Sequence, residues 1–435
     1  MNHAATLQDA RERDSTDPLR AFRARFALPR DERGREVVYL SGHSLGLAPL
    51  AVRELLSQEL DEWSRLAVQG HEHARRPWVP YHENLTAGLA ALTGAHPGEV
   101  VAMNSLTVNL HLMLASFYRP AGRRTKILIE SGAFSSDRHA VASQIAWHGL
   151  DPATHLIELA PRAGEDTVAE AAIEECLQQH GGEIALVLWP GVQFRTGQAF
   201  DLARIARATH AQGCVMGFDL AHSIGNTPLA LRDSGADFAV WCSYKYLNGG
   251  PGAIGGCFIP ERHAQAQSRT QHSGGVPGAR LAGWWGHELE TRFLMEPQFR
   301  AAEGASAWQI SNPPILSATP LIASLAIFAE AGMPRLRAKS VALTDFMDTL
   351  VRRLEPQVRI LTPRASAARG CQLSIHIAGG TQRGRAVFDA LLERGVVCDW
   401  RTPDIIRVAP VPLYNRFEDV AHFAHTLREL VGPGA

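Results

Sequence analysis

The stretch FAVWCSYKYLNGGPGAIGGCFI, residues 238–259, decides the fold class. It opens with a continuously apolar run, which is typical of a strand buried on both faces. Lys245 follows that strand between Tyr244 and Tyr246, and a glycine-rich run then leads into a second apolar strand. A lysine at a buried strand end loses hydration, which favours the neutral, nucleophilic amine. Most lysines are solvated surface residues, so this position makes Lys245 a candidate for chemistry.

Other apolar runs of strand length precede this stretch. They are residues 99–103, 126–130, 155–159, 184–189 and 214–219. Segments with helical spacing lie around and between them, at 50–66, 108–118, 136–148, 167–180 and 201–211. This alternation predicts an α/β fold with a mostly parallel central sheet and helices on both faces.

The pattern changes after SNPPILS, residues 311–317, where fewer strands separate the helical segments. The change predicts a smaller α+β domain at the C-terminal end. Single cores stop growing near ~250–300 residues, so a chain of 435 residues is expected to divide. We predict an N-terminal arm (1–49) that joins the small domain, a large domain (50–310) and a small C-terminal domain (311–435).

Composition excludes several classes of protein. The charges nearly balance, with 43 Lys and Arg against 44 Asp and Glu, which argues against nucleic-acid binding. The six cysteines form neither a CxxC pair nor a Cys/His cluster at zinc spacing, so no metal is expected. The polar N-terminus has no signal-peptide core, and no apolar stretch is long enough to span a bilayer. We therefore expect a cytoplasmic protein with no membrane partner.

Polar residues at strand ends are the candidates for a binding site, because ligands bind beyond the carboxyl ends of strands in an open parallel sheet. Asp219 ends the strand CVMGFD, and His222 follows three residues later. An aspartate in this position is often only a helix N-cap. A buried carboxylate that faces a ligand instead needs a cationic partner, such as a protonated pyridine nitrogen.

Two strand-to-helix turns could bind a phosphate group. MNSLTVNLH turns into a helix at Leu106 and Thr107, and a helix N-terminus is a ready anion site. SGAFSSD repeats the arrangement with Ser135 and Ser136. Phe134 could lie on the face of a cofactor ring, with Asp137 nearby. Either turn alone is typical of an ordinary helix cap, but their joint occurrence at successive strand ends favours a site.

Two further motifs match known patterns only in part. Gly250, Gly252 and Gly255 spell GxGxxG, but they lead into a strand rather than a helix, so a dinucleotide site is rejected. GHSLG, residues 42–46, matches a serine nucleophile elbow. Several strands precede that elbow in a hydrolase, whereas about forty mostly polar residues precede Ser44 here. A serine hydrolase that uses Ser44 is therefore the less favoured alternative.

Taken together, the motifs resemble kynureninase, a fold-type-I pyridoxal-phosphate enzyme, over residues 37–430. The resemblance lies in GHSLGLAP, GHE (70–72), RPW (76–78), MNSLTVNLHLML, FSSD, FDLAHSIGN, CSYKYLNGGPG, GWWGHE, ISNPPIL and RVAPVPLYN. It implies hydrolysis of L-kynurenine or 3-hydroxykynurenine to the corresponding anthranilate and L-alanine. It also implies a homodimer with shared active sites, and a place in tryptophan catabolism and NAD biosynthesis.

The resemblance implies a role for each site residue. Lys245 would hold pyridoxal 5'-phosphate, Asp219 would pair with its ring nitrogen, and Tyr244 would be either an acid/base or only a phosphate ligand. The implied cofactor-binding residues are Leu106, Thr107, Phe134, Ser135, Ser136, Asp137, Asp219, His222, Tyr244, Lys245, Trp284 and Asn312, with Trp284 and Asn312 coming from the neighbouring subunit. The implied substrate-binding residues are Ser44, His71, Trp285, Asn312 and Arg407, where Arg407 would hold the α-carboxylate.

The sequence also departs from the kynureninase pattern. His43 stands where GNSLG is expected, FSSD replaces a Phe-Pro-Ser/Thr-Asp sequence, and Trp285 replaces a phenylalanine of some members. These departures leave open the choice between kynurenine and 3-hydroxykynurenine. A cysteine desulfurase or an aminotransferase of the same fold is the remaining alternative, although no cysteine is obviously placed on a mobile loop.

Overall fold

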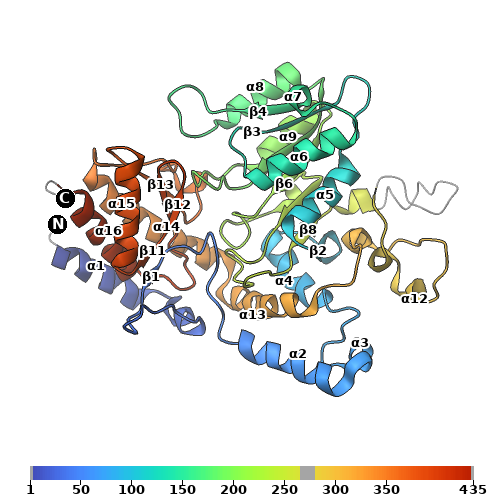
Figure 1. The fold of residues 1–435 in the computed structure, drawn as a ribbon, viewed down its shortest axis with the longest axis horizontal. Coiled ribbons are helices and arrows are strands. Elements are labelled where there is room, and N and C mark those ends of the chain that lie inside the picture. The colour runs from blue at the N-terminus through green and yellow to red at the C-terminus, as the bar shows by residue number, and fades with distance from the viewer. Residues whose placement is uncertain (1–2, 265–279, 433–435) are drawn as a thin grey trace.

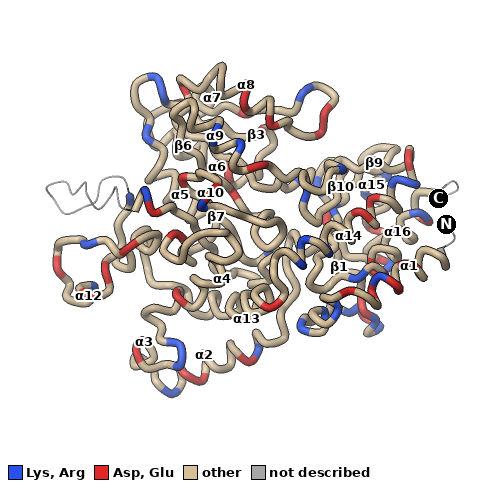
Figure 2. Tube along the Cα trace, turned by 180° about the vertical axis from the view of Figure 1, so that it is seen from behind, with Lys and Arg blue, Asp and Glu red and all other residues tan. Residues whose placement is uncertain are grey.

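The computed structural model describes residues 3–264 and 280–432. Figure 1 shows a larger body built around the central sheet and a smaller body that contains α1 and the C-terminal helices. Basic and acidic residues are interspersed over both bodies in the view of Figure 2, in keeping with the balanced composition. The fold class predicted from the sequence is confirmed.

The larger body is built on a seven-stranded sheet with the order β2-β8-β7-β6-β5-β3-β4. The strands are β2 (Val100–Ala102), β3 (Lys126–Glu130), β4 (Leu156–Leu159), β5 (Ile184–Pro190), β6 (Val215–Asp219), β7 (Phe238–Trp241) and β8 (Gly256–Phe258). The strands from β7 to β4 are all parallel, whereas β8 is antiparallel to both of its neighbours. Consequently β3, β5, β6 and β7 all end at the same edge of the sheet.

Both faces of this sheet are buried, which explains why its strands are continuously apolar. On β3, Leu128 belongs to one core cluster, while Ile127 and Ile129 belong to the other. The second cluster contains α5 (Leu106–Phe117) and α6 (Ser135–Trp147). The first contains α4 (Glu83–Thr93), α8 (Glu170–His180), α9 (Leu202–Ala211) and α13 (Ile315–Ala331), and α2 (Val52–Leu66) packs on α13. Short helices complete this body at Gly70–His73 (α3), Pro152–His155 (α7), Leu231–Ser234 (α10) and Leu289–Arg292 (α12).

The smaller body contains a four-stranded antiparallel sheet with the order β12-β13-β10-β9. Its strands are β9 (Val358–Ile360), β10 (Leu373–Ile377), β12 (Asp399–Arg401) and β13 (Ile405–Val408), and its helices are α14 (Met333–Val351), α15 (Thr381–Glu393) and α16 (Phe417–Val431). The N-terminal arm joins this body, because α1 (His3–Thr16) packs on α16 and β1 (Val38–Tyr39) pairs with β11 (Val396–Val397). Figure 1 shows α1 beside α16.

The two bodies meet at the junction of α13 and α14. Helix α13 packs on α2 and α4, so its buried side chains belong to the core of the larger body, whereas α14 packs on α16. The sequence placed the boundary at residue 311; this packing favours a division at Gly332, which we offer as a proposal. No single helix in residues 3–264 and 280–432 is long and apolar enough to cross a membrane. Only α13 together with the helical segment from Met333 passes that criterion, and the two are bent by 83°.

Candidate active site

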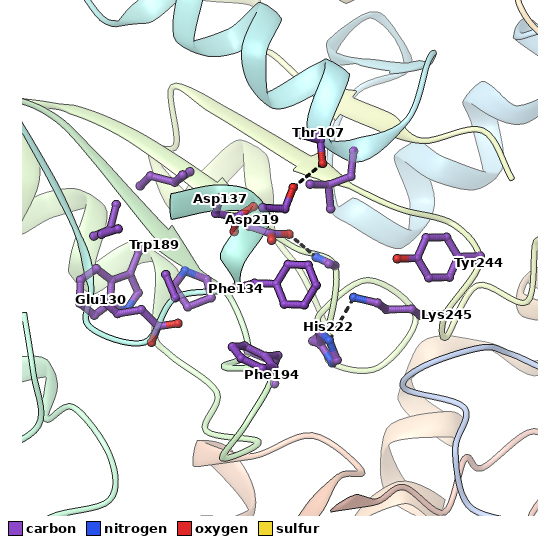
Figure 3. A pocket seen from close by; sticks show the side chains of 18 residues that line it. Thr107, Glu130, Phe134, Asp137, Trp189, Phe194, Asp219, His222, Tyr244 and Lys245 are labelled. Atoms are coloured by element: carbon purple, nitrogen blue, oxygen red, sulfur yellow. Dashed lines mark hydrogen bonds between the residues drawn. The ribbon is translucent and has the colours of Figure 1, made fainter. Parts of the chain in front are cut away.

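One cavity opens at the sheet edge where β3, β5, β6 and β7 end (Figure 3). It gathers residues from five separate segments of the chain, as the strand-end argument predicts. The predicted site residues that line it are Leu106, Thr107, Phe134, Ser136, Asp137, Asp219, His222, Tyr244 and Lys245. Ser135 does not line it; as the first residue of α6, it is exposed.

Lys245 enters the cavity from the loop after β7. Its Nζ lies 3.1 Å from His222 Nε2 and 5.8 Å from the centroid of the Phe134 ring. Burial and the charge of Lys245 lower the pKa of His222 well below its usual value. The imidazole is therefore neutral and can accept a hydrogen bond from the lysine amine.

Asp219 lies at the end of β6, beside Asp137 from the first turn of α6. Asp219 Oδ1 accepts a hydrogen bond from the backbone N–H of Ala221 at 2.7 Å. Burial and the neighbouring charge of Asp219 raise the pKa of Asp137 well above its usual value, and Asp137 Oδ1 has no hydrogen-bond partner among the residues that the structure describes. Two buried carboxyl groups with an unsatisfied oxygen provide a place for a cationic or N–H donor group.

Two helix N-termini meet at the cavity close to this acidic pair (Figure 3). Thr107 lies in the first turn of α5, Ser136 lies in the first turn of α6, and their hydroxyl oxygens are 2.6 Å apart in a hydrogen bond. The first N–H groups of each helix have no partner within the helix, and each helix dipole favours negative charge at its N-terminus. The sequence predicted a phosphate site at these two turns.

The aromatic ring of Phe134 forms part of the cavity wall. Phe134 is the N-cap residue of α6, and its side chain remains 41% exposed. Its ring packs edge-on against Phe194, with the centroids 5.3 Å apart. A large apolar side chain left exposed inside a cavity has a face free for a planar ligand.

These features fit pyridoxal 5'-phosphate. The two helix N-termini suit its phosphate, and the face of Phe134 suits its ring. The acidic pair with the unsatisfied oxygen suits its protonated ring nitrogen. Lys245, whose Nζ lies 5.8 Å from the centroid of the Phe134 ring, supplies the amine that can bond to an aldehyde carbon.

Arg407 lies on β13 of the smaller body and its side chain is almost completely buried, at 1% exposure. Its Nε donates to Asp399 Oδ2 at 2.7 Å, and its Nη1 donates to the backbone oxygen of Phe194 at 2.6 Å. Because Phe194 also lines the cavity, this contact connects the guanidinium to the cavity wall. Burial lowers the pKa of Arg407 to about 10, so the group keeps its positive charge at neutral pH.

The GHSLG segment packs directly on the lysine loop. The backbone N–H of Gly46 donates to the oxygen of Tyr244 at 2.8 Å, and a Cβ at Gly46 would lie 2.3 Å from the oxygen of Lys245. Ser44 itself does not line the cavity, and it follows a two-stranded sheet separate from the central one. A nucleophile elbow would follow a strand of the central sheet, so the structure gives this alternative no support.

Four residues assigned to the site by resemblance line a different cavity. They are His71, Trp284, Trp285 and Asn312. His71, Trp284 and Asn312 are exposed, and the indole N–H of Trp284 donates to the oxygen of Arg292 at 3.0 Å. Within one chain, the structure therefore does not bring these four residues to Lys245.

The sequence reasoning did not single out Glu130 and Phe194, which line the cavity, or Asp399, which pairs with Arg407 outside the cavity lining. Glu130 ends β3 and lines the cavity, and burial raises its pKa to about 8. The strand-end rule that found Asp219 could also have found Glu130. Phe194 follows β5 in the same way, but apolar residues at strand ends carry no obvious signal. The role of Asp399 depends on strand pairing, which the sequence does not reveal.

Comparison with known proteins identifies close relatives along almost the whole chain. A family model described as the kynureninase C-terminal domain matches residues 336–427. A protein named kynureninase from Xanthomonas campestris pv. campestris (strain B100) is 56% identical over 420 residues, which cover 96% of this chain and 95% of that protein. Another kynureninase, from Xanthomonas axonopodis pv. citri (strain 306), is 55% identical and covers 97% of this chain and 96% of that protein.

Solved structures share the fold at much lower identity. The cystine C–S lyase C-DES, in a complex with cysteine persulfide, has a TM-score of 0.75 and 18% identity, covering 91% of this chain and 98% of that one. The cysteine desulfurase CsdA from Escherichia coli has a TM-score of 0.73 and 19% identity, covering 95% and 98%. At such identities the likeness establishes the fold alone.

Proposed function

The chain belongs to the kynureninase family, and from this premise we propose that it hydrolyses L-kynurenine, or 3-hydroxykynurenine, to the corresponding anthranilate and L-alanine. The reaction breaks the Cβ–Cγ bond of the side chain and consumes one water molecule. The observation that carries the proposal is the cavity that joins Lys245, Asp219, Phe134 and the N-termini of α5 and α6. The identity of 56% to proteins named kynureninase supports the choice of substrate.

The cofactor is pyridoxal 5'-phosphate, which supplies, when bound, an electron sink for the bonds to the substrate α-carbon. Asp219, with Asp137 beside it, would keep the ring nitrogen protonated through a buried carboxylate. Lys245 Nζ lies where it can take a proton from the α-carbon of an amino acid and return it. His222 is neutral and 3.1 Å away, so it can hold that amine in place without adding charge.

The substrate is held at its other end by Arg407 in this proposal. A guanidinium binds a carboxylate through two parallel hydrogen bonds, which fixes the orientation of the α-carbon as well as its position. That orientation decides which bond of the α-carbon stands perpendicular to the cofactor ring. Ser44 would contact the ketone of the side chain, in keeping with the contact between its neighbour Gly46 and the lysine loop.

We propose a homodimer in which the second cavity of one chain completes the Lys245 cavity of the other. The aryl group would then meet His71, Trp285 and Asn312 of the partner. Apolar side chains near the second cavity support the proposal, because Phe293, Leu294 and Met295 are 52%, 62% and 69% exposed. Contiguous exposed apolar residues of this kind mark protein–protein contacts.

The six cysteines, all unpaired and buried, support a reducing compartment, so we propose the cytoplasm. They also weaken the cysteine desulfurase alternative, because that chemistry needs a reactive thiol that can reach the substrate. Burial raises the pKa of Cys242, the cysteine nearest in sequence to Lys245. We further propose that the enzyme acts in tryptophan breakdown, where kynurenine is formed.

Product analysis tests the function. Purified protein supplied with pyridoxal 5'-phosphate and L-kynurenine should form anthranilate and alanine in equal amounts with no keto acid present. A requirement for a keto acid, with no alanine formed from kynurenine, would make the chain an aminotransferase. Labelling of Ser44 by a fluorophosphonate, with activity that needs no cofactor, would instead establish the serine hydrolase.

A further inference from the structure

The direction in which Arg407 presents its guanidinium is set by residues around it. Among the hydrogen bonds in the described part of the chain, Nε donates to Asp399 Oδ2 at 2.7 Å and Nη1 donates to the oxygen of Phe194 at 2.6 Å. The Nη2 atom lies 2.6 Å from the same Asp399 oxygen as part of the ion pair. An arginine side chain has many rotamers, so a carboxylate on its Nε side restricts which edge remains for a ligand.

Asp399 is well placed to fix this arrangement because it is part of the sheet. It begins β12, and its Cα pairs directly with that of Arg407 on the antiparallel strand β13. Opposite residues of an antiparallel pair have adjacent side chains. The strand pairing therefore places the Asp399 carboxylate beside the Arg407 guanidinium.

The charges around Asp399 leave one positive charge for a ligand. Arg401 Nε also lies 3.0 Å from Asp399 Oδ2, so two guanidinium groups share a single carboxylate. The resulting net charge of this group matches one carboxylate of an amino-acid substrate. A buried arginine with no counter-charge would be costly, so Asp399 also offsets the desolvation of Arg407.

His43 is the fourth member of this group. It is fully buried, neither ring nitrogen has a hydrogen-bond partner, and its Nε2 lies 3.9 Å from Asp399 Oδ2. Burial and the charge of Arg407 lower the pKa of His43 to about 3, so the imidazole adds no charge at neutral pH. His43 therefore packs beside the carboxylate and leaves the charge balance to Asp399, Arg401 and Arg407.

We propose that Asp399 is a positioning residue for the substrate α-carboxylate and that it acts only through Arg407. This inference rests on the proposed function, since it takes an α-amino acid as the ligand of Arg407. Asp399 holds the Nε side of the guanidinium and the Phe194 oxygen holds Nη1, so that the buried Nη2, which has no hydrogen-bond partner among the described residues, is the N–H group left for the ligand.

The test compares two ligands that resemble opposite halves of kynurenine. L-Alanine carries the α-carboxylate without the aryl ketone, and 2-aminoacetophenone carries the aryl ketone without the carboxylate. In Asp399→Asn, the Kd of alanine for the cofactor-loaded protein, read from the cofactor absorbance, should rise about tenfold, the usual cost of a lost charge-assisted hydrogen bond. The inhibition constant of 2-aminoacetophenone should not change, whereas kcat/KM for kynurenine should fall.

Asp404→Asn is the matched control. Asp404 follows β12 in the same hairpin, but its ion pairs are with Arg195 and His376, at 3.3 and 3.4 Å. Its substitution should leave the binding of both ligands unchanged. A second comparison places Asp399→Asn in an Arg407→Leu background, where it should cause no further loss of alanine binding, because a residue that acts only through Arg407 has nothing left to position.

Three results would overturn the inference. They are unchanged alanine binding in Asp399→Asn, equal weakening of both ligands, and an additional loss in the Arg407→Leu background. If Arg407→Leu does not fold, Arg407→Lys takes its place, since lysine keeps the charge without the fork of N–H groups. A wild-type protein that forms no anthranilate but shows the expected alanine results would refute the proposed function and leave the role of Asp399 intact.

Discussion

At the scale of single residues, burial changes the protonation state of Glu130 in the cavity wall. Glu130 is 3% exposed, and its Oε1 accepts a hydrogen bond from Gln193 Nε2 at 3.3 Å. Burial and, to a smaller extent, the charge of Asp219 raise the pKa of Glu130 from 4.5 to about 8. At neutral pH this side chain is therefore largely protonated in the protein without its cofactor.

This shift predicts how stability depends on pH. Between pH 4.5 and about 8 the folded protein binds a proton at Glu130 that the unfolded chain has lost, so stability falls as the pH rises through that range. Glu130→Gln removes this contribution. At pH 8 the cofactor-free variant should melt at a higher temperature than the wild type, and at pH 5 the difference should shrink.

Thermal unfolding at the two pH values is the measurement, with Glu54→Gln on the exposed side of α2 as the control. If Glu130→Gln and the wild type lose stability equally between pH 5 and pH 8, the carboxyl of Glu130 is not held protonated by burial.

Tyr244 is either an acid/base or only a phosphate ligand, and a single substitution distinguishes the two roles. Burial raises the pKa of its phenol, so the hydroxyl is protonated at neutral pH and can donate a hydrogen bond or a proton. Figure 3 shows this hydroxyl pointing into the cavity. If the phenol moves a proton, Tyr244→Phe should lower kcat about 10²–10⁴-fold with the cofactor retained. If it only binds the phosphate, the variant should lose cofactor affinity and keep kcat at saturating cofactor.

The sequence identifies those site residues that lie at the end of an apolar strand, because the strand end also sets their position in the cavity. Lys245 and Asp219 each follow a buried apolar strand, and the structure brings both into one cavity. Arg407 could be assigned only by resemblance, because it lies in the other body and reaches the cavity wall through Phe194. Asp399 has its partner on the neighbouring strand β13, and no local pattern indicates such pairing.

At the scale of elements, the predicted central strands correspond to β2 through β7, with their ends shifted by a few residues. Their apolar runs are unambiguous because both faces are buried. Helix α4 packs between β2 and α13, and it was missed although its buried residues recur at helical spacing, because Ala87 and Ala91 on its exposed side are apolar and mask the pattern. Helix α1 was missed for the opposite reason: its sequence is strongly polar, and packing on α16 stabilises it.

The close contact between the GHSLG loop and the lysine loop makes a prediction about Gly46. A Cβ there would lie 2.3 Å from both the oxygen of Lys245 and Oδ1 of Asn248. Gly46→Ala should therefore push the two loops apart, destabilising the protein by ~1–3 kcal/mol, and should weaken cofactor binding. Chemical unfolding and a cofactor titration measure the two effects.

Gly182→Ala is the matched control, because a Cβ at Gly182 would meet no atom within 4 Å. If Gly46→Ala binds the cofactor as tightly as Gly182→Ala does, the two loops do not depend on each other.

At the scale of the whole molecule, the two separate cavities predict that active sites are shared between chains. Lys245→Ala disables one cavity and Trp284→Ala disables the other, so each homodimer should be inactive. A mixed dimer contains one site with both residues intact. Random mixing of the two variants should therefore restore about a quarter of the wild-type activity.

Activity after co-expression or after mixing and refolding is the measurement, with each variant alone as the control. If the mixture stays as inactive as its components, the second cavity does not complete the first one across a dimer. If Trp284→Ala alone is fully active, Trp284 has no part in the site.

The central claim is that Lys245 carries the hydrolysis of kynurenine in this cavity. The most direct test adds L-kynurenine to the cofactor-loaded wild type and to Lys245→Ala side by side and follows the fluorescence of anthranilate. The account predicts continuous anthranilate formation by the wild type and none above background by the variant. Equal rates in the two proteins, or no anthranilate from a wild type that has bound its cofactor, would contradict it.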